Sequence, residues 1–183
     1  MLKNQSVDYL VDFVIPFVGL SLGNHSFDFE VNNTFFEHFE YSEIKKGKAN
    51  IEVNLERQER MLVFGFRIQG SVQVTCDRCL DLFDHPVNGH EQLIVKFGHE
   101  RLEESEDVLM IPRTDYQIDL APLIYEYINL LLPIRHVHPM NKNGEYACDP
   151  EVTRFITEIP EHEDTDPRWD ALRGLTGNQN EES

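Results

Sequence analysis

The chain has 183 residues, and its 33 Asp and Glu against 16 Lys and Arg give a formal net charge of −17 at pH 7. A chain this acidic repels polyanions, so it is not a general nucleic-acid binder, and any RNA contact must be local or made through a partner. Apolar residues make up 40% of the chain, including 12 Phe, which suffices for the core of an ordinary domain. We expect a single domain over residues 1–176 and a flexible tail over residues 177–183.

Cysteine content and hydropathy indicate the compartment. Three cysteines are an odd number and too few for a disulfide scaffold, which favours a reducing, cytoplasmic environment. The apolar stretch 11–22 contains Asp12 and no small-residue cleavage site follows it, so we interpret it as a strand rather than a signal peptide. No apolar run approaches the ~20 residues that cross a bilayer, and no membrane partner is expected.

The first third of the chain predicts a hairpin and a short helix. Residues 8–18 are rich in Val, Ile and Phe, as in a buried or edge strand, and residues 25–31 alternate weakly, so the two can pair. Asn33 or Thr34 could cap a short helix that carries three Phe residues. Residues 51–55 then alternate as a further strand.

The strongest pattern lies in the middle of the chain. Every even position from 62 to 76 is apolar or small, which predicts a long half-buried strand, and odd positions from 83 to 97 continue the pattern on a returning strand. Cys76 and Cys79 therefore sit at the tip between two strands. Residues 100–107 hold five acids and one Arg and predict a solvated loop.

Helical spacing of apolar residues follows over residues 119–132, with Pro122 in the first turns and Pro133 at the end. Asp166 before Pro167 predicts a short terminal helix over residues 166–173. A run of strands before one main helix predicts an α+β fold: a mostly antiparallel β-sheet, or a partly closed barrel, covered by that helix, with the short terminal helix at the end.

The Cys-x-x-Cys pair has the spacing of half a zinc site, because two intervening residues let both thiolates reach one tetrahedral ion. The other ligands could come from Cys148 and a nearby imidazole. Alternatively the cysteines are small core residues, since Cys76 continues the apolar face of its strand. A redox role is less favoured, because that motif normally opens a helix in a βαβ unit.

Other chemistry has weaker support. His136 and His138 are two apart and could hold a metal on one side of an extended segment, although single surface histidines are commoner. The chain has no phosphate-binding glycine motif and no nucleophile elbow. Its carboxylates cluster in loops, which favours a solvated acidic face over a paired-carboxylate active site.

Four features together resemble the YceD family, which is associated with accumulation of large-subunit ribosomal RNA in bacteria and plastids. The matching positions run from about residue 11 to residue 175, in the family's order and approximate spacing. They are Cys76, Asp77, Arg78, Cys79, Leu80 and Phe83; Ile118, Asp119 and Leu120 before a helix that ends in Leu131, Leu132 and Pro133; a later His and Cys; and Asp166, Pro167, Arg168, Trp169, Asp170, Ala171 and Leu172.

The resemblance implies a ligand set and a role. The family's His falls on His138 and its later Cys on Cys148, so the resemblance implies one structural zinc ion held by Cys76, Cys79, His138 and Cys148. The Phe-rich N-terminal part and the segment between Cys148 and Pro167 depart from the family pattern. The family implies a role in ribosome production and carries no established catalytic residues, so none is assigned here and no nucleotide cofactor is expected.

Two hypotheses follow for the mode of action, and a third, an RNA-processing hydrolase, lacks a catalytic constellation. In the first, a non-enzymatic ribosome-biogenesis factor binds a basic ribosomal protein or an rRNA-processing factor through acids at Glu103, Glu104, Glu106 and Asp107. In the second, the chain contacts rRNA directly through a local basic patch. The candidate residues of that patch are Lys45, Lys46, Lys48, Arg57 and Arg60.

Overall fold

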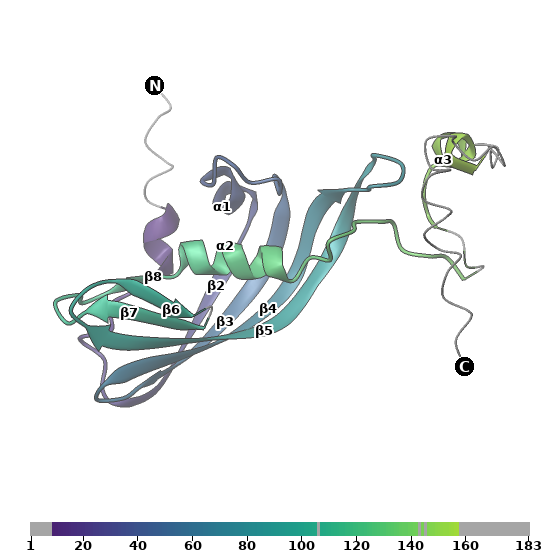
Figure 1. Cartoon of the computed structure of the whole chain (residues 1–183). Helices are drawn as coiled ribbons and strands as arrows, with labels where there is room; N and C mark the ends of the chain where they lie inside the picture. Colours follow the sequence, from purple (N-terminus) through teal and green to yellow (C-terminus); the bar gives the residue numbers. More distant parts are fainter. Residues whose placement is uncertain (1–8, 106, 143, 145, 158–183) are drawn as a thin grey trace, which may run out of the picture. The chain divides into compact units, whose positions relative to one another are not determined.

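The computed structural model describes residues 9–105, 107–142, 144 and 146–157 (Figure 1). The chain divides into two compact units, residues 1–147 and residues 148–183. The described elements, in chain order, are the 3-10 helix η1 (Tyr9–Phe13), β1 (Val14–Ile15), β2 (Gly23–Val31), α1 (Asn33–Glu37), β3 (Gly47–Arg57), β4 (Met61–Thr75), β5 (Leu82–Gly98), β6 (Leu102–Ser105), β7 (Val108–Pro112), β8 (Ile118–Asp119), α2 (Ala121–Leu130) and α3 (Pro150–Thr157).

A six-stranded sheet forms the first unit, with the strand order β2-β3-β4-β5-β7-β6. Every neighbouring pair is antiparallel except β5 and β7, which run parallel. The predicted α+β class is confirmed. The sheet is open, with β2 and β6 at its edges, so of the two predicted arrangements the sheet is found and the barrel is not.

The long hairpin of β4 and β5 is the centre of the sheet, as the alternating pattern predicts. The two strands pair from Met61 opposite Lys96 to Thr75 opposite Leu82. Alternate side chains of β4 are buried, and Leu62, Phe64 and Ile68 have no exposed surface. A strand that is apolar on one face and polar on the other needs a cover on the apolar face only.

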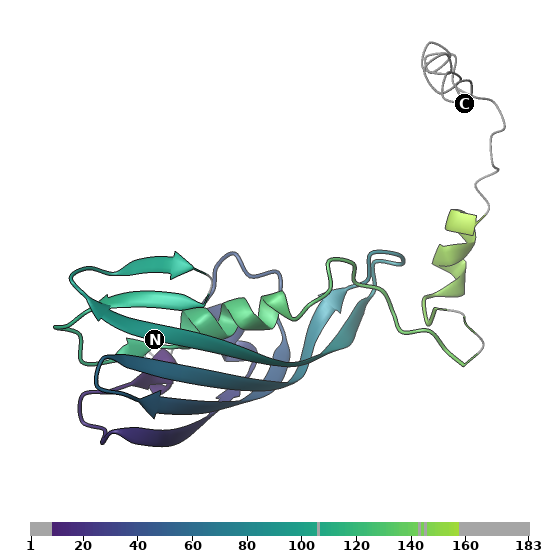
Figure 2. The same ribbon diagram turned by 60° about the horizontal axis from the view of Figure 1, so that its bottom comes forward.

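Helix α2 supplies that cover and lies along one face of the sheet (Figures 1 and 2). Ile124 and Ile128 of the helix are fully buried, and the ring centroid of Tyr127 lies 5.1 Å from that of Phe66. Just beyond the helix, Leu131 packs so closely on Gly89 that a Cβ there would come within 2.2 Å of the leucine side chain. The prediction that this helix covers the sheet is therefore confirmed, and it does so on the face that carries Phe64, Phe66 and Ile68.

The N-terminal segment differs from its prediction. It forms η1 and the two-residue β1, which pairs with β8 and not with β2; β2 pairs instead with β3. Phe13, Ile15 and Phe17 are buried, and the Phe13 ring stacks on Phe29 with centroids 5.3 Å apart. The apolar alternation thus reflects a segment that packs onto the face of the sheet rather than one that extends it.

Four further elements differ from the prediction in whole or in part, or lie outside the described residues. The acidic segment expected as a loop contains β6, which pairs with β7 through an irregular register. The short Phe-rich helix is confirmed as α1, but its cap is Asn32, whose side-chain oxygen accepts from the Thr34 N–H. Helix α3 was not predicted, and the predicted terminal helix over residues 166–173 lies outside the described residues.

Candidate metal centre

The turn between β4 and β5, residues 76–81 (the knuckle turn), brings two cysteines together. The Cys76 N–H donates to the Asp81 carbonyl at 2.8 Å, and the Leu80 N–H donates to the Cys76 carbonyl at 2.9 Å. Leu80 has a φ of 65°, in the left-handed region that closes such turns. The Arg78 N–H also donates to the Cys76 sulfur at 3.4 Å, so the turn holds that thiolate from its backbone.

The segment after α2 places an imidazole beside the turn. Asp77 fixes this segment twice: its N–H donates to the His136 carbonyl at 2.7 Å, and its carboxylate accepts from the His136 N–H at 2.6 Å. Two residues further on, the His138 ring packs against Phe83 with centroids 4.5 Å apart. Nδ1 of His138 then lies 3.4 Å from Sγ of Cys79.

The four residues that the family resemblance implies lie together. One ligand atom from each of Cys76, Cys79, His138 and Cys148 lies within 4.8 Å of all the others, and the three cysteines are buried. Bond lengths to zinc put a thiolate sulfur and an imidazole nitrogen about 3.6 Å apart in a tetrahedral site, close to the separation of Cys79 and His138. His136 is not part of this group; its backbone binds Asp77 instead.

The electrostatics of the cluster favour thiolate. Burial raises the pKa of the Cys76 thiol, but hydrogen bonds from the backbone N–H groups of Cys79, Arg78 and His138 and from the Cys79 side chain outweigh it and lower that pKa to about 6. Thiolate, not thiol, is the form that ligates a metal. A donor set of three sulfurs and one nitrogen is typical of structural zinc, and the cluster could hold such an ion.

The structure separates the predicted basic residues into two groups. Lys48 lies near the start of β3, opposite Ser71, whereas Arg57 ends the same strand, opposite Leu62. Lys45 and Lys46 precede the strand and Arg60 follows it. At about 3.4 Å per residue, the two groups lie roughly 30 Å apart along β3.

The predicted acidic cluster lies at the β6 edge of the sheet. Glu103 is exposed on β6, and Asp107 is exposed just before β7, where its carbonyl accepts from the Ile94 N–H at 2.8 Å. The Glu104 side chain and Glu106 lie outside the described residues.

Sequence reasoning missed the role of Asp77 and of the apolar surface beside it. The available signal was an acid, Asp77, between the two cysteines, because an acid in so short a turn can accept a hydrogen bond from the backbone of another segment. A cavity of about 500 Å³ opens next to the knuckle turn. At its border, Ile134 is almost entirely exposed and Leu130 is 67% exposed. The apolar periodicity does not mark these positions, because Leu130 lies on the exposed side of the last helical residues and Ile134 follows the end of the helix.

The fold and the cluster define a class: an α+β protein with an open sheet and, at one end of its central hairpin, a Cys3His cluster that could hold a metal ion. Residues 64–176 match the model of the family described as "Large ribosomal RNA subunit accumulation protein YceD". This match covers more than half of the chain, and the protein belongs to the YceD family. No curated protein and no solved structure matches the chain.

The membrane prediction has one structural test. Over the described residues, no helix combines the length and the apolar character that crossing a bilayer requires.

Proposed function

We propose that this protein is a cytoplasmic, non-enzymatic factor that supports accumulation of large-subunit rRNA by binding a basic ribosomal protein or an rRNA-processing factor. The family description supports the link to large-subunit rRNA. The net charge of −17 supports a basic partner, because complementary fields speed and orient association.

The cavity beside the knuckle turn carries this proposal. Its lining is mainly apolar and includes two acids, so it suits a segment that has both apolar and basic side chains. The lining residues are Glu43, Ile44, Val74, Thr75, Asp77, Asn129, Leu130, Leu132, Pro133, Ile134 and His136. The knuckle turn and the start of β5 add Leu80 and Leu82, which are 75% and 61% exposed. Exposed apolar side chains grouped around a cavity are a mark of protein interfaces.

The metal cluster supports a structural role within this surface. Four protein donors fill the tetrahedral coordination that zinc adopts in structural sites. When bound, the ion would fix the knuckle turn to the segment of residues 136–138. This chain's own residues, Asp77 above all, already orient that segment, and it forms part of the border of the cavity.

The test uses an exposed apolar residue at the cavity and a matched one elsewhere. Ile134→Asp should weaken binding to the large-subunit ribosomal proteins at least tenfold, as expected when a large apolar contact is replaced by a charge. Leu22→Asp changes an exposed apolar residue before β2 and should leave binding unchanged.

Recovery of partners from lysate with and without ribonuclease completes the test. Recovery of a ribosomal protein that survives ribonuclease and is lost in Ile134→Asp supports the proposal. Equal loss in both variants, or recovery that requires RNA, would overturn it.

A further inference from the structure

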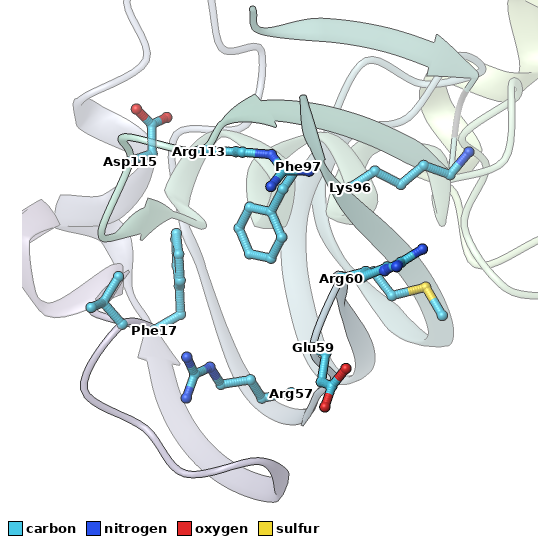
Figure 3. Close-up of a pocket in the computed structure, with 10 residues that line it drawn as sticks. Phe17, Arg57, Glu59, Arg60, Lys96, Phe97, Arg113 and Asp115 are labelled. Carbon is cyan, nitrogen blue, oxygen red and sulfur yellow. The ribbon is translucent and has the colours of Figure 1, made fainter. Parts of the chain in front are cut away.

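The opposite end of the central hairpin holds a cavity of about 900 Å³ with an unusual charge for this chain (Figure 3). Of its ten lining residues, four are cationic and two are acidic, although the whole chain carries a net charge of −17. The lining residues are Phe17, Val18, Arg57, Glu59, Arg60, Met61, Lys96, Phe97, Arg113 and Asp115. We call this cavity the arginine pocket.

Two separate segments supply its arginines. Arg57 ends β3, Arg60 lies in the turn before β4, and Arg113 follows β7. In Figure 3 the side chains of Arg57 and Arg113 lie on opposite sides of the open space, and Arg60 lies on a third side. The fold thus brings Arg113 to the same space as Arg57 and Arg60, which are more than 50 residues away in the sequence.

These guanidinium groups are available to a ligand. Within the described part of the chain, none of the three arginines has a carboxylate oxygen within 4.0 Å. Arg60 and Arg113 are exposed, and Arg57 is half-buried and donates one of its hydrogen bonds to the Leu20 carbonyl. That bond fixes Arg57 in place and leaves its other donors to the cavity.

Two aromatic rings form the apolar part of the pocket. Phe17 is 2% exposed and packs against the half-buried Phe97, with ring centroids 5.7 Å apart. Both rings border the open space beside the arginines (Figure 3). Guanidinium groups match phosphate oxygens in two-point hydrogen bonds, and aromatic surfaces bind unpaired bases, so the combination is typical of single-strand recognition.

We propose that the arginine pocket binds single-stranded RNA, with Arg57, Arg60 and Arg113 on backbone phosphates and an unpaired base against Phe97. The concave shape suits an unpaired nucleotide, because a duplex does not enter a cavity of this size. The choice of RNA among phosphate ligands rests on the proposed function, whereas the choice of a phosphate ligand rests on the pocket alone. Binding at this end is local and is compatible with an acidic chain, since only nearby charges act at physiological salt.

A pair of double variants tests the proposal. Fluorescent oligouridylate is titrated with the full chain, and anisotropy is measured over a series of salt concentrations. Arg60→Gln with Arg113→Gln should weaken binding at least about tenfold at 0.1 M salt and should reduce the salt slope by about 1.4, from 0.7 per single-strand phosphate contact. Arg57 is left intact because it supports Leu20.

The matched control, Lys45→Gln with Lys48→Gln, removes the same charge at the far end of β3 and should leave the affinity within about twofold. Equal weakening in both double variants would overturn the proposal, since the general field and not the pocket would be responsible. So would displacement of the oligouridylate by pyrophosphate or polyglutamate at the same anion concentration, because the site would then take small phosphates or acidic peptides.

The two proposals fail separately. Loss of oligouridylate binding in every form of the protein, with ribosomal proteins still bound, would remove only the RNA proposal. If Ile134→Asp bound ribosomal proteins as the parent does, and oligouridylate still bound in the arginine pocket, only the protein-docking proposal would be wrong.

Discussion

The two ends of the β4–β5 hairpin differ in how their residues are held. At the knuckle turn, three buried thiols and an imidazole lie within 4.8 Å of one another, so their donor atoms face one another. At the other end, three arginines surround a cavity of about 900 Å³. One hairpin therefore carries a site suited to an internal ion and a site suited to an external ligand.

The difference shows why net charge alone is a poor guide to binding. The chain is strongly acidic, yet its cavities beside the two ends have opposite character: acids and apolar groups near the knuckle turn, cations and aromatic rings near Arg57. Charges at the two ends are separated by several Debye lengths at physiological salt, so each end acts on its own ligand.

Loss of the metal site should have the largest effect on stability of all the changes considered, because it would release the knuckle turn from the segment that carries His138. Protein purified without a metal-affinity tag should contain about one zinc per chain, and His138→Gln should lose it together with much of the thermal stability, because structural zinc binding contributes about 10 kcal/mol or more in small zinc peptides. His99→Gln, an exposed histidine after β5, is the control and should retain the metal. Elemental analysis and thermal melting decide; metal-free protein with free thiols and full stability would contradict the zinc site.

Both ends of the β4–β5 hairpin depend on the same hydrophobic core, in which α2 packs on the sheet. Ile124→Asp would bury a charge under α2 and should cost several kcal/mol, enough to unfold a typical domain and to abolish both binding activities. Leu130→Asp makes a comparable change at a 67% exposed position of the same helix and should melt close to the parent. A folded Ile124→Asp protein with unchanged melting would show that the face of α2 is exposed.

A substitution at Tyr127 should stabilise the core, whereas Ile124→Asp should destabilise it. Over the described residues its buried hydroxyl has no hydrogen-bond partner, so Tyr127→Phe should stabilise the fold by about 1 kcal/mol at neutral pH. Burial, followed by the carboxylates of Glu91, Glu126 and Asp107, raises the pKa of Tyr127 from 10.0 to about 12. Because the folded state disfavours the phenolate, the parent should lose stability between pH 10 and pH 12.

Chemical denaturation across this pH range measures the effect. Tyr127→Phe should show a smaller alkaline loss than the parent, and Tyr125→Phe on the same helix should keep the parent's loss. An equal loss in all three proteins would show that another group causes the alkaline sensitivity.

The acidic cluster should have the smallest effect on folding and a distinct effect on rate. Exposed charges contribute little to stability, so exchanging Glu103, Glu104, Glu106 and Asp107 for Gln or Asn should change the free energy of unfolding by no more than about 1 kcal/mol. Association with basic ribosomal proteins should slow and depend less on salt. Oligouridylate affinity should stay the same or rise, because four negative charges are gone.

A control with the same charge change lies on the outer face of the sheet, where four exposed acids can be neutralised instead: Asp28, Glu30, Glu56 and Asp84. Equal slowing in both variants would assign the effect to net charge and would remove the acidic cluster as the docking surface.

The central hairpin and the main helix could be predicted because each has a regular spacing of apolar residues, every second residue in the strands and every third or fourth in the helix. The alternation over residues 62–76 has one regular interpretation, a strand, and the turn containing Cys76 and Cys79 follows from where the alternation changes phase. Residues 13, 15 and 17 also alternate, but the pattern records burial and not pairing, so it did not exclude a short segment beside β8.

The sites were predictable only where the sequence keeps their residues close. Cys76 and Cys79 share one turn, and the family order indicated His138 and Cys148. Arg113 could not be linked to Arg57 from the sequence, because the parallel pairing of β5 and β7 brings the end of β7 to the pocket. Lys45, Lys46 and Lys48 are close to Arg57 in the sequence, but most of the eleven-residue strand β3 lies between them and Arg57 in space.

The position of the cluster on the hairpin predicts an order of assembly during folding. The knuckle turn closes over a few residues as β4 and β5 pair, so Cys76 and Cys79 come together through local contacts at a small entropic cost. His138 lies 59 residues beyond Cys79 and follows α2 in the chain, so we expect it to reach the turn after α2 has docked on the sheet. A metal ion can thus meet two ligands early and its full set late, and complete coordination would mark a chain whose helix and sheet are already joined.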